Sequence, residues 1–277
     1  MAHEHSQNEV EALAQELWSA NEGGQMIEIP PSERPGFDLD KAYEVEARLK
    51  QLHEGGGHKA VGRKVGYANK AMWRVLKLET LVWAHMYEDT VHFSDGNSAG
   101  LAVQHPRSLK IEPEIVFGLK RPIADEGLDA AAALARADWL ALGFEIIDCP
   151  FPGWRFQPSD FVASFGLHVA LVIGEKVQVR PELVAKLGDE LSRFKVRMSK
   201  GGEFVEEGSG RNSLKSPALC LAELGAAIAR RFPEEPLIAR EIVSSGTLTS
   251  GHLAGKGDLW TAEVEGISLP ALTLRLT

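Results

Sequence analysis

The sequence predicts an α+β protein in which a mixed, mostly β roll lies behind a helical N-terminal region. Two observations lead to this prediction. Apolar residues recur at helical spacing in the first part of the chain, whereas short β-rich runs separated by glycine make up most of the remainder. We therefore expect a helical N-terminal region over residues 1–58 and a β-rich core over residues 59–277.

The composition narrows the choice of partners. The 277 residues are 44% hydrophobic and carry a net charge of −9, which disfavours nucleic acid and anionic membranes as partners. No apolar run approaches the roughly 18 residues of a membrane span, and the N-terminus lacks the apolar core of a signal peptide. The only cysteines, Cys149 and Cys220, form no CxxC motif, which is typical of a reducing cytoplasm. We expect a cytoplasmic homo-oligomer that binds a small molecule.

Two helices are predicted in the N-terminal region. In residues 9–20, Val10, Leu13 and Leu17 share one face at helical spacing. A Pro- and Gly-rich link over 30–38 follows, and Asp38 is a plausible N-cap of a second helix. The apolar stripe of this helix is formed by Ala42, Val45, Leu49 and Leu52, and the glycines of 54–58 end it.

The rest of the chain reads mainly as strands. We predict strands over 60–66, 110–118, 142–148, 167–174, 194–199, 204–208, 240–245, 259–266 and 269–276. Glycines at 201 and 202 predict a hairpin between two of these strands. Two helices, over 127–139 and 217–232, interrupt the series.

Three glutamates lie within apolar strand-like sequence. Glu112 and Glu114, in 110-KIEPEIVFG-118, are two apart, so their side chains should lie on one face of the strand. Glu145 lies in a similar run, and three converging carboxylates would repel unless a divalent cation joined them. Oxygen ligands in this number suit Mg²⁺ or Mn²⁺, with Asp148 as a possible fourth ligand. Alternatively, Glu112 and Glu114 form the solvent face of an edge strand, which Pro113 would suit.

Two further segments are candidates for binding an anionic substrate. Lys64 lies among glycines and valines, where desolvation would make it a proton donor or acceptor and nearby carboxylates would keep it a cation. An ordinary surface Arg-Lys pair, with Lys64 as its lysine, is the alternative. Residues 242–258 are rich in small side chains, so unshielded backbone N–H groups there could bind a carboxylate. A glycine-rich hairpin loop is the alternative, and neither the P-loop nor the dinucleotide fingerprint matches.

The order of these motifs resembles a known family. GRKVG, KIEPEI, FEIID, SSGTLTSGHLAGKGD and AEVEGI occur in the order found in the 2-keto-4-pentenoate hydratase and 4-oxalocrotonate decarboxylase group of the fumarylacetoacetate hydrolase superfamily. The resemblance covers essentially the whole chain. It implies a mixed β roll with Mg²⁺ or Mn²⁺ bound by Glu112, Glu114 and Glu145, with Lys64 as the catalytic lysine. It also implies that the substrate carboxylate lies near Ser245, Gly246 and Thr247.

The sequence departs from this family in two segments. Val82 stands where hydratases of the group often carry an acidic residue. In 160–168, Asp160 is kept, but Ser164 and Phe165 replace a polar pair. We expect Trp83 and Phe165 to narrow the distal part of the substrate pocket and favour an apolar tail. The histidines of the two segments either compensate for the lost polar groups or are structural; they are His85 and His168.

The resemblance implies a lyase that hydrates a short 2-hydroxydienoic or 2-oxo-enoic acid, as in meta-cleavage degradation of aromatic compounds. Lys64 would help transfer the proton that converts the dienol to the conjugated ketone. Alternatives are decarboxylation of a 2-oxo-enedioate and C–C bond hydrolysis of an acylpyruvate. A catalytically silent oxo-acid binding protein is a fourth possibility, which the retained glutamates and Lys64 argue against.

Overall fold

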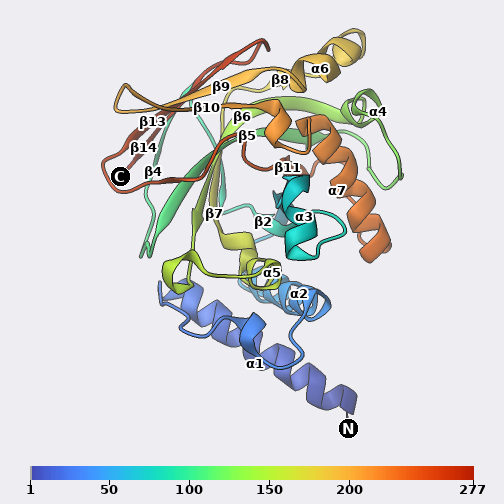
Figure 1. The fold of residues 1–277 in the computed structure, drawn as a ribbon, viewed down its shortest axis with the longest axis vertical. Helices are drawn as coiled ribbons and strands as arrows, with labels where there is room; N and C mark the ends of the chain where they lie inside the picture. The colour runs from blue at the N-terminus through green and yellow to red at the C-terminus, as the bar shows by residue number, and fades with distance from the viewer. Residues whose placement is uncertain (1) are drawn as a thin grey trace.

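The N-terminal helices of the computed structural model pack against the rest of the molecule (Figure 1). The structure describes residues 2–277, with side chains from residue 7 onward. Helices α1 (Ala2–Glu22) and α2 (Leu39–Gly55) are joined through the short turn η1 (Pro31–Glu33). As predicted, the Asp38 carboxylate caps α2 by accepting a hydrogen bond from the Lys41 N–H at 2.9 Å. The core that contains the main sheet also buries Leu13, Leu17 and Leu49 of these helices. The predicted boundary between the N-terminal region and the β-rich core, at residues 58/59, stays a prediction.

Two sheets form the β-rich part of the chain, which confirms the mixed, mostly β core. The larger sheet has the order β2-β1-β11-β5-β6-β7-β3, with β12 paired to β5 and β8 paired to β6. Its strands are β1 (Ala60–Gly66), β2 (Val82–Tyr87), β3 (Val91–Phe93), β5 (Leu109–Leu119), β6 (Ala137–Asp148), β7 (His168–Ile173), β8 (Val177–Gln178), β11 (Ile242–Ser244) and β12 (His252–Leu253). The smaller sheet has the order β10-β9-β13-β14-β4. Its strands are β4 (Ser98–Leu101), β9 (Lys195–Lys200), β10 (Glu203–Ser209), β13 (Leu259–Glu265) and β14 (Leu272–Leu276).

Short helices connect the strands. They are α3 (Lys70–Leu76), α4 (Ala130–Leu134), α5 (Pro158–Ala163), α6 (Val184–Leu191), α7 (Pro217–Arg231), η2 (Pro152–Trp154), η3 (Phe165–Leu167), η4 (Pro181–Leu183) and η5 (Gly210–Asn212). The helix predicted over 127–139 was too long, because α4 ends at Leu134 and Trp139 already pairs with Gly118 of β5. Here the strand pairing of β6 overrides the helix propensity of the alanine-rich run. No helix in the described part of the chain is long and apolar enough to cross a membrane.

The antiparallel pair of β5 and β6 lies in the middle of the larger sheet, so the edge-strand alternative for Glu112 and Glu114 was wrong. β5 pairs with β6 on one side and with β11 and β12 on the other. Pro113 is tolerated in this central strand because its carbonyl accepts a hydrogen bond from the Leu248 N–H at 2.9 Å. In a strand the nitrogen and the carbonyl of one residue point to the same side, so the Pro113 nitrogen also faces the loop after β11. Its missing N–H therefore costs no hydrogen bond to the neighbouring strand β6.

The two faces of the larger sheet have different roles. The register places Lys64 opposite Ala84 and Ser244, and Ser244 opposite Val116, so these residues share one face with Glu114. We call this the inner face. Beyond the polar residues it is filled by a small apolar cluster that includes Met86, Val91, Val116, Ala141 and Leu171. The opposite, outer face belongs to the main core, which the helices complete.

Candidate metal centre and active site

The three predicted glutamates meet on the inner face of the sheet. Glu112 and Glu145 are paired directly across β5 and β6, and Glu114 lies two residues further along β5, opposite Gly143. One oxygen of each carboxylate lies within 4.8 Å of one oxygen of each of the others. Glu114 and Glu145 are fully buried, whereas Glu112 is half-buried. The structure therefore brings together the carboxylates that the two-residue spacing placed on one face.

Burial and mutual repulsion perturb these carboxyl groups. Burial, followed by the charge of Glu145, raises the pKa of Glu112 to about 7. Burial, followed by the charges of Glu145 and Glu112, raises the pKa of Glu114 well above its usual value. Burial also acts to raise the pKa of Glu145, but Lys64 and His168 outweigh it and lower that pKa. Lys64 and His168 thus favour the ionised form of Glu145, whereas burial and mutual repulsion favour the protonated forms of Glu112 and Glu114.

The hydrogen bonds of Glu114 leave one oxygen available. Its Oε2 accepts hydrogen bonds from the Ser244 hydroxyl at 2.5 Å and from the Gly246 N–H at 2.7 Å. Its Oε1 is buried and has no hydrogen-bond partner. A buried carboxylate oxygen without a partner is rare, and here it lies in a cluster of acidic oxygens. This donor set fits a hard divalent cation such as Mg²⁺ or Mn²⁺.

Lys64 lies beside the carboxylate cluster, so the surface-lysine alternative was wrong. Only 2% of its side chain is exposed, and its Nζ lies 3.0 Å from Glu145 Oε2. Nζ also donates a hydrogen bond to the Gly166 carbonyl at 2.9 Å and lies 4.7 Å from the centroid of the Phe161 ring. Gly166 has a φ of +61°, and a Cβ at this position would lie 2.7 Å from Lys64 Cδ. Glycine at 166 therefore allows the backbone to approach the lysine.

His168 orients Glu145 from the neighbouring strand. Its Nδ1 lies 2.9 Å from Glu145 Oε1, and its Nε2 lies 3.0 Å from the Thr90 hydroxyl. The sequence offered His168 either as a replacement for lost polar groups or as a structural histidine, and Thr90 carried no sequence signal at all. Ser244 was also missed as an individual residue, although it begins the small-residue loop that drew attention.

The loop after β11 holds Glu114 in place. Gly246 donates its N–H to Glu114, and the Ser245 hydroxyl donates to the Ile115 carbonyl at 2.8 Å. The Thr247 hydroxyl donates to the Thr249 carbonyl at 3.0 Å. Gly246 has a φ of +85°, and an added Cβ would lie 2.8 Å from the Ala68 Cβ. The loop therefore acts on the cluster through its backbone, and its contact with a substrate carboxylate stays a prediction.

The structure does not bring the two predicted pocket aromatics to this site. Trp83 pairs with Val65 on the outer face, and its ring lies 4.6 Å from that of Tyr43. Strand alternation causes this, because the inner-face residue opposite Lys64 is Ala84 rather than Trp83. The centroid of the Phe165 ring lies 6.1 Å from that of Trp18, against the N-terminal helices. Lys64 is instead contacted by the carbonyl of Gly166, the residue that follows Phe165.

The remaining polar candidates have partners outside the cluster. Asp148 accepts hydrogen bonds from the Ser108 N–H at 2.7 Å and from Arg107 Nε at 2.8 Å, which removes it as a fourth ligand. His85 lies on the outer face, where its Nδ1 is 2.6 Å from Glu46 Oε1. Asp160 accepts hydrogen bonds from both the N–H and the hydroxyl of Ser32, each at 2.6 Å. These side chains fix the structure around the site.

Comparison with curated proteins finds relatives along nearly the whole chain, although no protein-family model matches it. The chain is 25% identical over 258 residues to 2-hydroxyhexa-2,4-dienoate hydratase of Comamonas testosteroni, covering 93% of this chain and 94% of the relative. It is 27% identical over 263 residues to 4-oxalocrotonate decarboxylase of Pseudomonas sp. (strain CF600), covering 95% of each. It is 25% identical over 257 residues to 2-keto-4-pentenoate hydratase of Paraburkholderia xenovorans (strain LB400), covering 93% of this chain and 91% of the relative.

Solved structures agree with this result. 4-Oxalocrotonate decarboxylase from Pseudomonas putida G7, complexed with magnesium and adipate, superimposes with a TM-score of 0.86 at 25% identity and covers 98% of each chain. Fumarylpyruvate hydrolase from Pseudomonas aeruginosa, in complex with Mn²⁺ and pyruvate, shares the fold with a TM-score of 0.57 at 15% identity, covering 78% of this chain and 89% of the other. As its motifs predicted, the chain is a homologue of the 2-keto-4-pentenoate hydratase and 4-oxalocrotonate decarboxylase group and has the fold of the fumarylacetoacetate hydrolase superfamily.

Proposed function

We propose that the protein is a Mg²⁺- or Mn²⁺-dependent hydratase that adds water to a short 2-hydroxydienoic or 2-oxo-enoic acid. The observation that carries this proposal is the buried carboxylate cluster, with an unpartnered Glu114 oxygen, beside the buried Lys64. Relatives named as hydratases of such acids, aligned along nearly the whole chain, support the choice of reaction.

Two of the three carboxylates of the proposed metal site have a group that orients them. Ser244 and Gly246 fix Glu114, and His168 fixes Glu145, while Glu112 is held by its position on β5. When bound, the divalent cation would act as a Lewis acid that stabilises negative charge on the substrate's 2-oxygen. Groups that hold ligands in place are worth about 10–100-fold in metal affinity, so His168 and Ser244 belong to the proposed site.

Lys64 is the proposed proton carrier. An ammonium group has three N–H donors, of which one faces Glu145 and one donates to the Gly166 carbonyl. The third remains for the substrate, beside the carboxylates that would hold the metal. Because the side chain is buried and fixed at both contacts, its proton is presented at a defined position, which general acid–base catalysis requires. Lys64 would thus move the proton that turns the dienol into the conjugated ketone.

Lys110 supports decarboxylation of a 2-oxo-enedioate as the second candidate. It lies two residues before Glu112 on the same face of β5, and its Nζ lies 3.8 Å above the Trp154 ring. Its positive charge acts on the neighbouring Glu112, where it opposes the rise of the pKa, so the anion-attracting field of this ammonium group reaches the carboxylate cluster. It could therefore receive the second carboxylate of a diacid, and 4-oxalocrotonate decarboxylases are among the relatives. The expected exclusion of diacids by Trp83 and Phe165 loses its support, because these rings lie elsewhere.

Turnover of two substrates tests the proposal. We would compare kcat/KM for 2-hydroxypenta-2,4-dienoate and 2-hydroxymuconate with Mg²⁺ and after chelation, following the loss of conjugated absorbance and the release of CO₂. The hydratase proposal predicts metal-dependent hydration and a preference for the monocarboxylic acid. A preference for the diacid, with CO₂ released as the diacid is consumed, would make the protein a decarboxylase instead. That preference should then be lost in the variant Lys110→Met.

We also propose that the enzyme is a homo-oligomer of the cytoplasm. The two cysteines, Cys149 and Cys220, are free and buried, which suits a reducing compartment. Exposed apolar side chains such as Val75 and Leu253 provide surface for contact between chains. Light scattering after size-exclusion chromatography measures the assembly, and a monomer at micromolar concentration would contradict it.

A further inference from the structure

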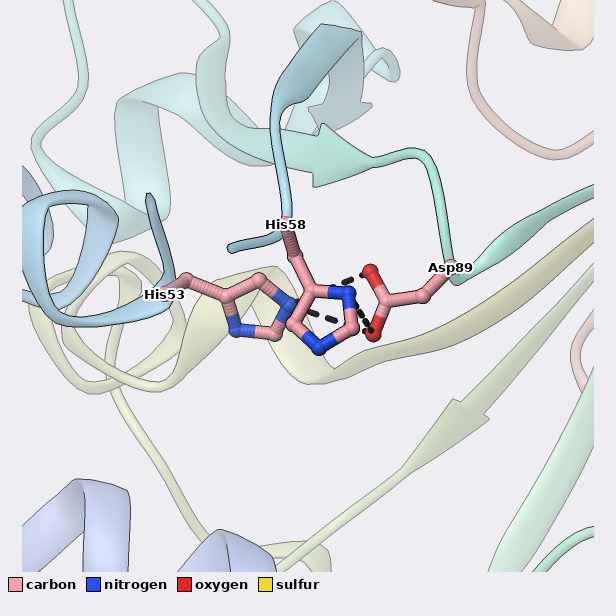
Figure 2. Close-up of side chains that lie close together, drawn as sticks. All are labelled: His53, His58 and Asp89. Atoms are coloured by element: carbon pink, nitrogen blue, oxygen red, sulfur yellow. Dashed lines mark hydrogen bonds and ion pairs between the residues drawn. The ribbon is translucent and has the colours of Figure 1, made fainter. Parts of the chain in front are cut away.

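A second group of metal-ligating side chains lies outside the carboxylate cluster (Figure 2). His53 Nε2 lies 3.2 and 3.3 Å from the two carboxylate oxygens of Asp89. His58 Nδ1 lies 3.6 Å from Asp89 Oδ2. One ligand atom from each of the three residues lies within 4.8 Å of the others. None of these residues has a role in the proposed hydration.

Three different segments supply this group. His53 comes from the last turn of α2, His58 from the glycine-rich link that follows, and Asp89 from the turn between β2 and β3. The His53 ring is buried and stacks on Tyr87 with ring centroids 3.9 Å apart. The side chains of His58 and Asp89 are 46% and 35% exposed. One ligand is therefore fixed by packing, while the other two open to solvent, from which an ion and its water can enter.

We propose that His53, His58 and Asp89 form a second cation site that takes a borderline divalent ion of the Zn²⁺ class. Two imidazole nitrogens and a carboxylate are ligands that zinc prefers, whereas Mg²⁺ prefers oxygen ligands alone. Zinc bonds of about 2.0–2.1 Å place the corners of a tetrahedron about 3.3 Å apart. With Asp89 Oδ2 as the carboxylate ligand, the separations of 3.3 Å to His53 Nε2 and 3.6 Å to His58 Nδ1 are close to that spacing. Water from the open side supplies the fourth ligand.

The position of the site gives the bound ion a structural role. It would join the end of α2 to the β2–β3 turn, two segments far apart in sequence. Asp89 directly precedes Thr90, whose hydroxyl contacts His168 Nε2 at 3.0 Å, and His168 in turn holds Glu145. Occupancy would therefore stabilise the turn that supports the residue orienting Glu145. This effect is independent of whether the carboxylate cluster hydrates a dienoate.

Calorimetric titration with Zn²⁺ tests the site. The full chain is first saturated with Mg²⁺, and the N-terminal histidines His3 and His5 are replaced by Ala in every protein so that they cannot bind the probe. We expect one Zn²⁺ per chain, with a thermal stability that rises on binding. His58→Ala and Asp89→Asn should each weaken binding by roughly 10-fold or more, because even groups that only orient a ligand contribute about that factor. Both positions are partly exposed, so the metal-free melting temperature should stay close to the parent's.

The matched control is His252→Ala. His252 Nε2 lies 2.7 Å from Glu206 Oε2, so it forms a histidine–carboxylate pair that lacks a second histidine. Its removal should leave zinc binding unchanged. The electronic absorption of bound Co²⁺ gives a second measurement and should show four-coordination. Absence of saturable binding, equal binding in the parent and both cluster variants, or displacement of zinc by Mg²⁺ would each overturn the proposal and leave an ordinary His–Asp hydrogen-bond network.

Discussion

Replacing Lys64 by Met separates the structural role of its charge from its catalytic role. The Lys64 side chain is 2% exposed, and its ammonium group lies 3.0 Å from the fully buried Glu145. Methionine keeps the apolar stem of the side chain but removes its charge. Glu145 then keeps only His168 as a partner, while two other carboxyl groups lie beside it. Removing one partner of a buried ion pair costs about 3–5 kcal/mol. For a chain of 277 residues that corresponds to a fall in melting temperature of roughly 5–9 °C in the metal-free protein.

Magnesium should reverse much of this loss. A dication bound by the three glutamates supplies the positive charge that Lys64 no longer provides, and it is no longer repelled by a neighbouring ammonium group. Lys64→Met should therefore bind Mg²⁺ at least as tightly as the parent protein and gain more thermal stability from it. Turnover should nevertheless fall by roughly 10²-fold or more, because the proton carrier is lost.

Thermal unfolding with and without Mg²⁺, combined with steady-state kinetics, measures all three effects. The control is Lys110→Met, which removes a half-buried lysine from the same face without breaking an ion pair, so its metal-free melting temperature should change little. Equal melting temperatures of Lys64→Met and the parent in the absence of metal would refute the account of the ion pair. Normal turnover in the Mg²⁺-loaded variant would refute the catalytic role of Lys64.

Three further predictions concern the carboxylate cluster. Glu114→Gln should keep the fold but lower Mg²⁺ affinity and turnover together, and full activity of this variant after exhaustive chelation would contradict the metal site. Because the pKa of Glu112 is raised to about 7 and its carboxyl must lose a proton to bind metal, Mg²⁺ affinity measured by calorimetry should fall at least about tenfold between pH 8 and pH 6. The raised pKa of Glu114 adds to this fall. The raised pKa also means that Glu112 binds more protons in the folded, metal-free protein than in the unfolded chain. Its contribution to the free energy of unfolding is therefore lost as the pH rises toward about 7. Gly246→Ala places a side chain at a φ of +85° with its Cβ 2.8 Å from the Ala68 Cβ. The variant should therefore be less stable than the parent by more than about 1 kcal/mol in urea unfolding, and it should bind Mg²⁺ more weakly. An unchanged urea midpoint would contradict this prediction.

The sequence by itself determined the class of fold and the residues of the carboxylate cluster. Strand alternation makes a two-residue spacing put Glu112 and Glu114 on one face whatever the sheet looks like, and apolar neighbours make a lone charge there costly. The N-cap at Asp38 and the hairpin at Gly201 and Gly202 were equally local, since caps and turns depend on a few adjacent residues.

Only the tertiary structure decided which groups surround these glutamates. The pairing of β7 with β6 and β3 brings His168 to Glu145 and Thr90 to His168, which no local pattern records. Trp83 was assigned to the site because its segment diverges from the family, but the register of β2 on β1 points it to the outer face, one residue away from Ala84. The group of His53, His58 and Asp89 likewise exists only because the end of α2 packs beside the β2–β3 turn. Local sequence fixes periodicity and capping, whereas the register between distant strands fixes which side chains meet.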